Sequence, residues 1–446
     1  MKKLERRAII CLLLAAVLLL GLCLYCFRFF ADGSSWVSYP ANQHIYQNGV
    51  LASGSVYDRD GVMLADVADG TRIYNDSATV RRATAHAVGD KEGNIATGAL
   101  TAFGGKLSGY NFLTGTHSLS GNGRTLALTV DSDVNVAAYE ALAGRHGAVM
   151  VYNYETGEIV CLVSAPGLDP ADPAAVEGSY INKALSATFV PGSIFKLVTT
   201  AAAIDNLSDL SSWSYECTGA LEFGPDRITC PSAHGTVDLP QALAMSCNCA
   251  YATLSLRLGE ETLAEYVRKL GLTQSVEVNS LSTAAGSFSL SELAEVNLAW
   301  SGIGQYHDLV NPCAFMVYMG AIANGGVPVE PQLIQRVSAG KIPTSFYIKH
   351  RGTRMLSEST AARLAELMHN NVVQNYGEGN YPNLDLCAKS GTAEVGEGQT
   401  AHAWFAGFIR NENYPLAFVV LIENGGSGSG QAGAVANAVL QAAIRN

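Results

Sequence analysis

The stretch "ATFVPGSIFKLVTTAAAI", residues 187–204, contains only two side chains with strong chemistry, Ser193 and Lys196. They stand three residues apart in a run that is otherwise apolar or small. Pro191-Gly192 interrupts the chain just before them and predicts that a helix begins at about Ser193. A serine at that position is most often an N-cap, so Ser193 alone has an ordinary structural explanation.

Lys196 changes this interpretation, because residues three apart share one face of a helix. A buried lysine resists protonation, so its pKa falls and its neutral amine can take a proton from a serine hydroxyl. The helix N-terminus also favours negative charge developing at Ser193. The pattern therefore predicts a Ser–Lys nucleophile pair on a largely buried helix. The burial is predicted from apolar neighbours: Val190, Ile194, Phe195, Leu197 and Val198.

Two later stretches carry polar residues that give the weak S-x-x-K pattern its meaning. They are "MSCNCAY", with Ser246 and Asn248, and "CAKSGTAEV", with Lys389, Ser390, Gly391 and Thr392. Alone, the asparagine could be a turn residue, the lysine a solvated strand residue and the Ser-Gly pair a bulge. The conjunction of S-x-x-K, S-x-N and K-S-G in this order is typical of penicillin-binding proteins and serine β-lactamases.

With these three motifs the chain resembles a class B penicillin-binding protein of compact type, a D,D-transpeptidase. Other stretches resemble the family in the expected order. "GSVYDRDGVMLA" resembles the segment that opens the N-terminal module, and "NKALSATFVPGSIFK" resembles the block around the nucleophile. "GAVMVYNYETGEIVCLVSAPGLDP" resembles the first transpeptidase strands, and "HAWFAGFI" is also similar. Ile194 departs from the usual threonine, and K-S-G replaces K-T-G.

The resemblance implies a mechanism for peptidoglycan stem peptides. Ser193 attacks the carbonyl between two terminal D-alanines, Lys196 takes its proton, and an amine from a neighbouring stem peptide resolves the acyl-enzyme. β-Lactam antibiotics mimic this terminus, so penicillin is expected to acylate Ser193. The remaining roles are also implied by the family: backbone N–H groups of Ser193 and Thr392 as the oxyanion hole, Ser246 as proton relay, Asn248 holding Lys196, and Lys389 with Ser390, Gly391 and Thr392 binding the substrate carboxylate.

The pattern along the chain predicts an α+β fold, an antiparallel sheet flanked by helices plus an all-helical subdomain. Hairpins are expected around Asp60-Gly61 and at residues 155–157, helices from 187 to about 325, and strands near 384–396 and 403–424, before a last helix. The expected domains are a cytoplasmic tail and membrane anchor (1–30), a small α+β N-terminal penicillin-binding-protein module (31–130) and a transpeptidase domain (131–446).

The N-terminus predicts a membrane anchor. "MKKLERR" is basic, and residues 8–27 follow without a charge, enough for a helix of about 30 Å, one bilayer core. Only Arg28 follows the run, so the positive-inside bias puts the N-terminus in the cytoplasm and the catalytic domain outside the cell. A cleaved signal peptide is the alternative. It is disfavoured because the run is long and no small-x-small cleavage site follows.

Composition limits the partners. The chain has 446 residues, of which 48% are hydrophobic, and a formal net charge of −11. No long basic run follows the N-terminus, so nucleic-acid binding is not expected. The expected partners are stem peptides, β-lactams and the membrane, and family analogy adds a polytopic glycan polymerase. Alternatives of the same fold are a D,D-carboxypeptidase and a β-lactamase or β-lactam receptor; an inactive cell-wall-synthesis scaffold is the alternative from another class.

Cysteines and histidines predict no metal or organic cofactor. The cysteine spacing gives no zinc signature, and His86, His117, His234 and His402 are expected to be surface or structural residues. Cys217 and Cys230 flank a hairpin-like segment. They form either a disulfide, worth about 2–4 kcal/mol in an oxidising compartment, or two ordinary reduced thiols.

Overall fold

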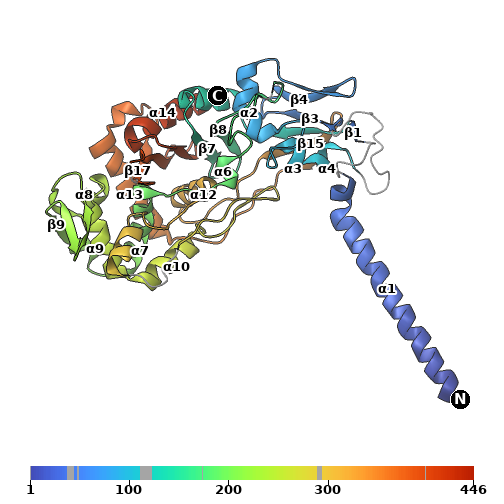
Figure 1. Ribbon diagram of the computed structural model, residues 1–446, viewed down its shortest axis with the longest axis horizontal. Coiled ribbons are helices and arrows are strands. Elements are labelled where there is room, and N and C mark those ends of the chain that lie inside the picture. The colour runs from blue at the N-terminus through green and yellow to red at the C-terminus, as the bar shows by residue number, and fades with distance from the viewer. Residues whose placement is uncertain are drawn as a thin grey trace.

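A five-stranded antiparallel sheet, ordered β17-β18-β19-β7-β8, forms the centre of the computed structural model (Figure 1). The structure describes residues 2–37, 45–47, 50–110, 123–172, 174–288, 294–396 and 398–445. The strands come from both ends of the catalytic region, as predicted: β7 (Gly147–Asn153), β8 (Ile159–Ala165), β17 (Leu386–Ala393), β18 (His402–Ile409) and β19 (Leu416–Ile422). Nearly every residue of these strands is buried, because helices cover both faces of the sheet.

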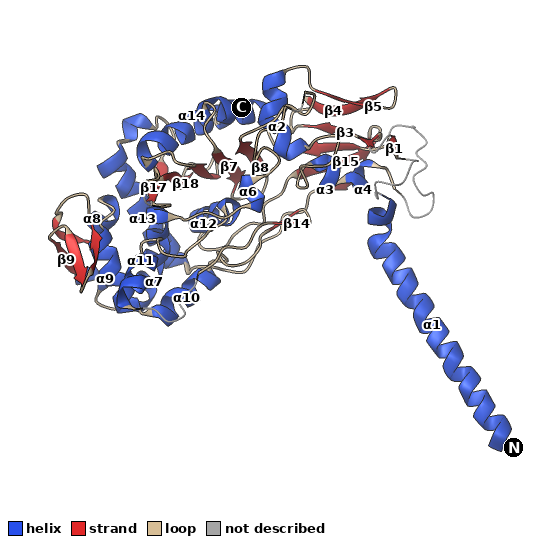
Figure 2. Ribbon diagram, in the orientation of Figure 1, coloured by secondary structure: helices blue, strands red, loops and turns tan. Residues whose placement is uncertain are grey.

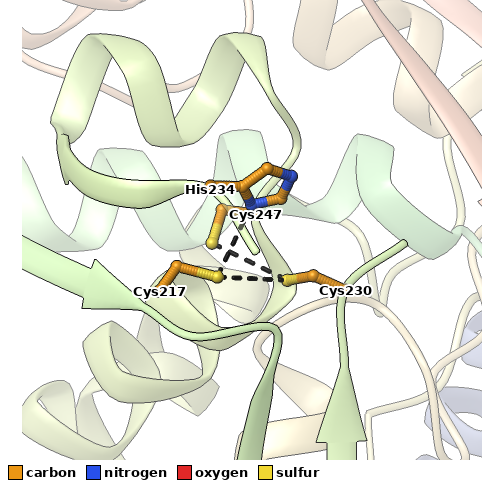
Figure 3. Close-up of side chains that lie close together, drawn as sticks. All are labelled: Cys217, Cys230, His234 and Cys247. Atoms are coloured by element: carbon orange, nitrogen blue, oxygen red, sulfur yellow. Dashed lines mark hydrogen bonds between the residues drawn. The ribbon is translucent and has the colours of Figure 1, made fainter. Parts of the chain in front are cut away.

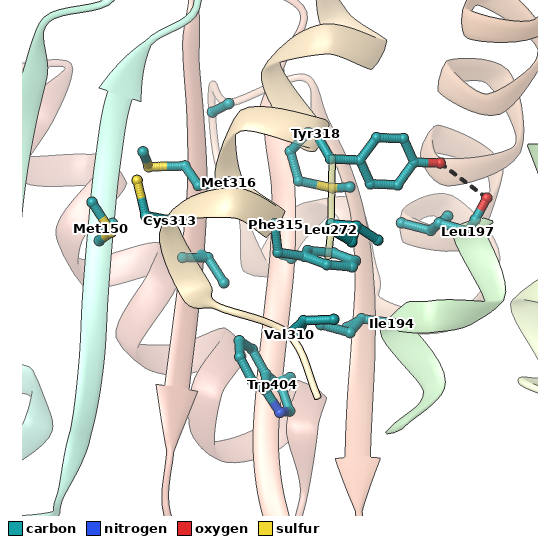
Figure 4. Packing of buried hydrophobic residues seen from close by; sticks show 14 of the residues in the cluster. Met150, Ile194, Leu197, Leu272, Val310, Cys313, Phe315, Met316, Tyr318 and Trp404 are labelled. Carbon is teal, nitrogen blue, oxygen red and sulfur yellow. Dashed lines mark hydrogen bonds between the residues drawn. The ribbon is translucent and has the colours of Figure 1, made fainter. Parts of the chain in front are cut away.

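Alternate residues of each central strand face different helices. Val149 packs in one core with α5 (Ser132–Leu142) and α14 (Gly433–Ala443). Its neighbour Met150 packs in the other, against α12 (Pro312–Ala323), as Figure 4 shows. The Asp131 carboxylate caps α5 by accepting hydrogen bonds from the first-turn N–H groups. The helix expected at the C-terminal end is α14.

A second, six-stranded sheet has the order β16-β15-β6-β3-β4-β5. The expected hairpin around Asp60-Gly61 is its β3–β4 pair. β15 and β16 come from far later in the chain: β15 pairs with β6 and so joins the N-terminal strands, and β16 pairs with β15. The domain boundary at residue 130 remains a proposal. If it is correct, the later segment β15–β16 completes the sheet of the N-terminal module. The strands are β3 (Ser55–Tyr57), β4 (Met63–Ala68), β5 (Thr71–Tyr74), β6 (Thr125–Leu128), β15 (Ile334–Ala339) and β16 (Ile342–Phe346).

Short helices cover this second sheet and connect it to the catalytic region. Arg81, on α2 (Ala78–Val88), makes two 2.7 Å hydrogen bonds to the carboxylate of Asp169, beyond β8. The other short elements here and nearby are α3 (Ala99–Ala102), α4 (Gly104–Leu107), β1 (Tyr46–Gln47), β2 (Val50–Leu51), β13 (Glu277–Val278) and β14 (Leu281–Ser282).

The fold class predicted from the sequence is confirmed, with one correction to the helical subdomain. It is not all-helical, because β9 (Ser214–Cys217) pairs with β12 (Gly235–Asp238), and β10 (Ala220–Phe223) pairs with β11 (Asp226–Thr229) (Figure 2). Glycines at the turns and β-propensity override the helical trend there. The helices of this region are α6 (Lys183–Ser186), α7 (Lys196–Asn206), α8 (Leu239–Ala244), α9 (Asn248–Leu258), α10 (Glu260–Lys269), α11 (Glu295–Ser301) and α13 (Glu358–Asn371).

The N-terminal helix α1 (Lys2–Val37) projects away from the rest of the molecule (Figure 1). Its mean hydropathy reaches 2.9, its apolar window buries no surface, and among the described residues it alone is long and apolar enough to cross a bilayer. This agrees with the predicted anchor at residues 8–27. Part of the connector that follows lies outside the described residues.

Candidate active site

The nucleophile segment begins with one 3₁₀ turn, Gly192–Phe195, that runs directly into α7. Ser193 lies inside this turn, and the residues at the two helix N-caps are Pro191 and Phe195, so the cap explanation for Ser193 is wrong. Gly192 has φ +57°, and a Cβ there would lie 2.6 Å from the Thr392 carbonyl oxygen. Only glycine fits this approach of the turn to β17.

Lys196 is fully buried one turn after Ser193. Its Nζ lies 3.0 Å from Ser193 Oγ, 3.0 Å from Ser246 Oγ, 2.7 Å from the Ser246 carbonyl oxygen and 2.7 Å from Asn248 Oδ1. Burial, and next the charge of Lys389, lower the pKa of Lys196 well below its usual value. Burial therefore favours the neutral form of this amine over its charged form.

Four oxygen atoms surround Lys196 Nζ. The Ser246 carbonyl and Asn248 Oδ1 can only accept hydrogen bonds, so each takes a hydrogen from the amine. In the neutral form, one lone pair remains to accept a hydrogen from a hydroxyl group. The Asn248 amide is oriented by its own nitrogen, which donates to the Thr229 carbonyl oxygen at 2.8 Å.

Ser246 lies between the two lysines. Its Oγ is 3.0 Å from Lys196 Nζ and 3.1 Å from Lys389 Nζ. Its backbone adopts φ +53°, a left-handed conformation that is uncommon for a residue other than glycine. Burial lowers the pKa of Lys389 to about 7. The hydroxyl thus connects two amines that both titrate below the normal range for lysine.

The third motif lies on β17, the edge strand of the central sheet. Gly391 passes close to the nucleophile segment: a Cβ there would lie 2.9 Å from the Pro191 carbonyl oxygen. Ser390 is held by Tyr376, whose hydroxyl donates to Ser390 Oγ at 2.8 Å and accepts from Ser390 N–H at 2.7 Å. Sequence reasoning missed Tyr376. Its only sequence signal is the following glycine, which ends a π-helical turn, Val372–Tyr376.

The three motifs meet in one open cleft. The predicted residues Ser193, Ser246, Asn248, Ser390 and Thr392 line it. Lys196 and Lys389 lie buried behind this wall. Sequence reasoning did not single out the other lining residues, Pro231, Met245, Trp300, Ile303, Gln305 and Glu394.

The histidines expected to be structural have different environments. His86 is buried, its Nε2 lies 2.9 Å from the Ser179 carbonyl, and burial lowers its pKa to about 4. His402 Nδ1 accepts a hydrogen bond from Asn424 N–H at 3.1 Å. His117 lies outside the described residues. His234 is half-buried, and its Nδ1 lies 3.6 Å from Cys217 Sγ.

Comparisons with known proteins agree with the family that the motifs predict. Residues 147–444 match the family described as the penicillin binding protein transpeptidase domain. The chain is 28% identical over 383 residues to the peptidoglycan D,D-transpeptidase PbpA of Mycobacterium tuberculosis, covering 77% of this chain and 76% of the relative. It is 27% identical over 326 residues to stage V sporulation protein D of Bacillus subtilis, covering 68% of this chain and 50% of the relative.

The solved structures show the same fold. Penicillin-binding protein A from M. tuberculosis as a penicillin G acyl-enzyme complex superposes with a TM-score of 0.75 at 25% identity, covering 88% of this chain and 99% of that one. The D,D-transpeptidase domain of a peptidoglycan glycosyltransferase from Eggerthella lenta gives a TM-score of 0.75 at 24% identity, covering 88% and 98%.

Proposed function

Because the chain belongs to the penicillin-binding protein transpeptidase family, we propose that it is a peptidoglycan D,D-transpeptidase that works through a serine acyl-enzyme and is acylated by β-lactams. The observation that carries the proposal is the position of Lys196 Nζ, 3.0 Å from Ser193 Oγ and 3.0 Å from Ser246 Oγ. The fold, the three motifs and the named D,D-transpeptidase relatives support it.

In the acylation step, Ser193 Oγ bonds to the carbonyl carbon between the two terminal D-alanines. Its proton passes to the lone pair of Lys196, which burial keeps neutral. Negative charge builds on the carbonyl oxygen, and the backbone N–H groups of Ser193 and Thr392 are the proposed donors there. Such a donor is worth roughly 3–4 kcal/mol in other acyl-transfer enzymes.

The leaving nitrogen needs a proton as the C–N bond breaks. Ser246 can donate its own hydroxyl proton to that nitrogen and take one from protonated Lys196, because its Oγ lies within hydrogen-bond distance of the amine. Lys389, 3.1 Å on the other side, supplies positive charge to the same hydroxyl and to the substrate carboxylate. Deacylation runs the same relay in reverse, with an amine of a second stem peptide as nucleophile.

The α1 helix supports a membrane anchor, and we infer the topology from charge. Lys2, Lys3, Arg6 and Arg7 precede the apolar run, so the N-terminus is cytoplasmic and the cleft is extracellular. A polytopic glycan polymerase is proposed as the partner, contacted through α1 and the β3–β4 hairpin, by family analogy alone.

Acylation tests the proposal on the full chain in detergent. Fluorescent penicillin is expected to label the wild type, and intact mass is expected to show one adduct on Ser193. Ser193→Ala should lose the adduct, whereas Ser212→Ala, an exposed serine in the 3₁₀ turn Leu210–Ser212 that follows α7, should keep it. Equal labelling of Ser193→Ala would contradict the proposal.

The lifetime of the adduct separates the alternatives of the same fold. A long-lived adduct is expected for a transpeptidase, and rapid turnover of the β-lactam would indicate a β-lactamase. Release of D-alanine from a pentapeptide with water alone as acceptor would indicate a carboxypeptidase. Full genetic complementation by Ser193→Ala would indicate a scaffold.

A further inference from the structure

Four side chains with metal-binding chemistry converge beside the active site (Figure 3). Cys217 ends β9, Cys230 follows β11, His234 precedes β12, and Cys247 precedes α9. Their three sulfur atoms and one ring nitrogen all lie within 4.8 Å of one another. The four residues are separated in the sequence. The pairing of β9 with β12 brings Cys217 close to His234.

The distances within the group match the edges of a metal tetrahedron. Cys217 Sγ lies 3.8 Å from Cys230 Sγ, which lies 3.8 Å from Cys247 Sγ, and Cys217 Sγ lies 3.6 Å from His234 Nδ1. Zn–S bonds near 2.3 Å and Zn–N bonds near 2.1 Å give tetrahedral edges of about 3.8 Å between sulfurs and about 3.6 Å between sulfur and nitrogen. The remaining distances between the four atoms are within 4.8 Å.

A disulfide explains this arrangement less well. Cys230 Sγ is near three sulfurs, those of Cys217, Cys247 and Cys249, at 3.5–3.8 Å. A disulfide joins only two sulfurs, at about 2.05 Å, and would leave the others and the imidazole without a role. Soft thiolates with one imidazole are the ligand type that zinc prefers.

We propose that Cys217, Cys230, Cys247 and His234 form a structural zinc site. Binding converts three thiols to thiolates and releases their three protons to solvent, so the zinc with its ligands carries one negative charge. His234 binds through Nδ1 and keeps its hydrogen on Nε2. All four positions are filled by protein, which is the pattern of a structural rather than a catalytic zinc.

The site braces the second catalytic motif. Cys247 stands between Ser246, with its left-handed backbone, and Asn248. Asn248 Nδ2 donates to the carbonyl of Thr229, the residue before Cys230. The ion would therefore connect the ends of β9 and β11 to the residues that contact Lys196. This positioning role rests on the proposed function, whereas metal binding does not.

Metal content tests the site directly. The full chain is purified in detergent with a phosphine reductant, and elemental mass spectrometry is expected to find about one zinc per chain. A mercurial thiol reagent should release that zinc. Cys217→Ser and Cys230→Ser should each lower zinc content at least about tenfold. Cys249→Ala is the matched control: its sulfur is 3.5 Å from Cys230 Sγ but outside the group of four, so it should retain zinc.

Two wild-type measurements apply even if the cysteine variants fail to fold. Cobalt(II) added to the chelator-treated protein should give thiolate-to-cobalt charge-transfer and tetrahedral ligand-field absorption, and zinc should raise the melting temperature. Less than half a zinc per chain after incubation with zinc chloride, no cobalt spectrum, or a Cys217–Cys230 disulfide in the isolated protein would overturn the site.

Penicillin acylation distinguishes failure of this site from failure of the proposed function. Removing zinc should slow acylation of Ser193 at least about tenfold, and zinc should restore the rate. Full-speed acylation without zinc overturns the positioning role. Zinc binding without any acylation would overturn the proposed function and leave the metal site standing.

Discussion

The chemistry at the residue scale depends on two buried lysines that share one hydroxyl. Lys196 and Lys389 both contact Ser246 Oγ, and neither side chain is exposed. Two charged ammonium groups this close in a dry site repel each other, and burial disfavours each charge separately. We therefore propose different roles for the two lysines: Lys196 acts as a neutral base, and Lys389 carries the charge when a substrate carboxylate is present.

This division predicts a bell-shaped pH profile for the second-order rate constant of β-lactam acylation. At low pH the rate falls because Lys196 becomes protonated and cannot accept the Ser193 proton. Above about pH 7 the rate falls because Lys389 loses the charge that attracts the β-lactam carboxylate. Stopped-flow measurement with a chromogenic β-lactam checks both limbs.

Lys389→Arg is the matched variant for the alkaline limb. A guanidinium stays charged throughout the accessible range, so the fall near pH 7 should disappear even if the maximal rate drops. Persistence of the same alkaline limb in Lys389→Arg would show that another group is responsible.

At the scale of elements, the cleft depends on how closely β17 approaches the turn that carries Ser193. Glycine at 192 and 391 permits backbone contact between the two, and Tyr376 fixes β17 from its other side. β17 is the edge strand of the central sheet, and we propose that an extended substrate lies along it, as a peptide does when it adds to a sheet. The geometry of the site is therefore set by packing between elements.

Gly391→Ala is expected to slow acylation by about 100-fold, because the new Cβ would push β17 away from the Pro191 carbonyl and a displacement of 1 Å can have that effect. Gly379→Ala is the control, since a Cβ there meets nothing within 4 Å. Stopped-flow acylation and circular dichroism of both variants check this. A Gly391→Ala protein as fast as wild type would refute the close approach.

Tyr376→Phe removes the hydroxyl that pairs with both Ser390 Oγ and Ser390 N–H. We expect a loss of about 1–2 kcal/mol in the free energy of unfolding, because the N–H group loses its acceptor, and weaker β-lactam binding. Tyr381→Phe is the matched control, since its ring stacks on the same Phe405 at 5.7 Å. Urea unfolding measures the free energy of unfolding of both variants. If the two values are equal, the Tyr376 hydroxyl does not stabilise Ser390.

At the scale of the whole molecule, the two large sheets are each built from separate segments of the chain, and the helix α1 projects away from them. β15 and β16 join the N-terminal strands, and the Arg81–Asp169 ion pair connects α2 to the catalytic region. These links connect the six-stranded sheet to the catalytic region. By contrast, the apolar window of α1 buries nothing.

Removal of residues 1–37 is therefore expected to give a protein that needs no detergent and acylates within about twofold of the full chain, because distant sites act independently. Ultracentrifugation and labelling with fluorescent penicillin measure both properties. The intact mass of the full chain expressed in cells distinguishes an anchor from a signal peptide: loss of the first thirty or so residues would contradict the anchor.

The sequence by itself determined the local features. The i, i+3 spacing of Ser193 and Lys196, the turn chemistry at Asp60-Gly61 and the apolar N-terminal run all act within a short stretch of chain, so their structural meaning can be inferred without the fold. The three motifs identified the family because their order and residue types are unusual together.

Only the tertiary structure decided which distant groups meet. Lys389 reaches Ser246, Tyr376 holds Ser390, and β15 joins the N-terminal sheet. His234 lies beside Cys217 for the same reason, although their spacing in the chain resembled no metal site. The physical reason is that strand pairing and core packing bring together side chains from separate segments, and neither propensity nor periodicity along the chain encodes that distance.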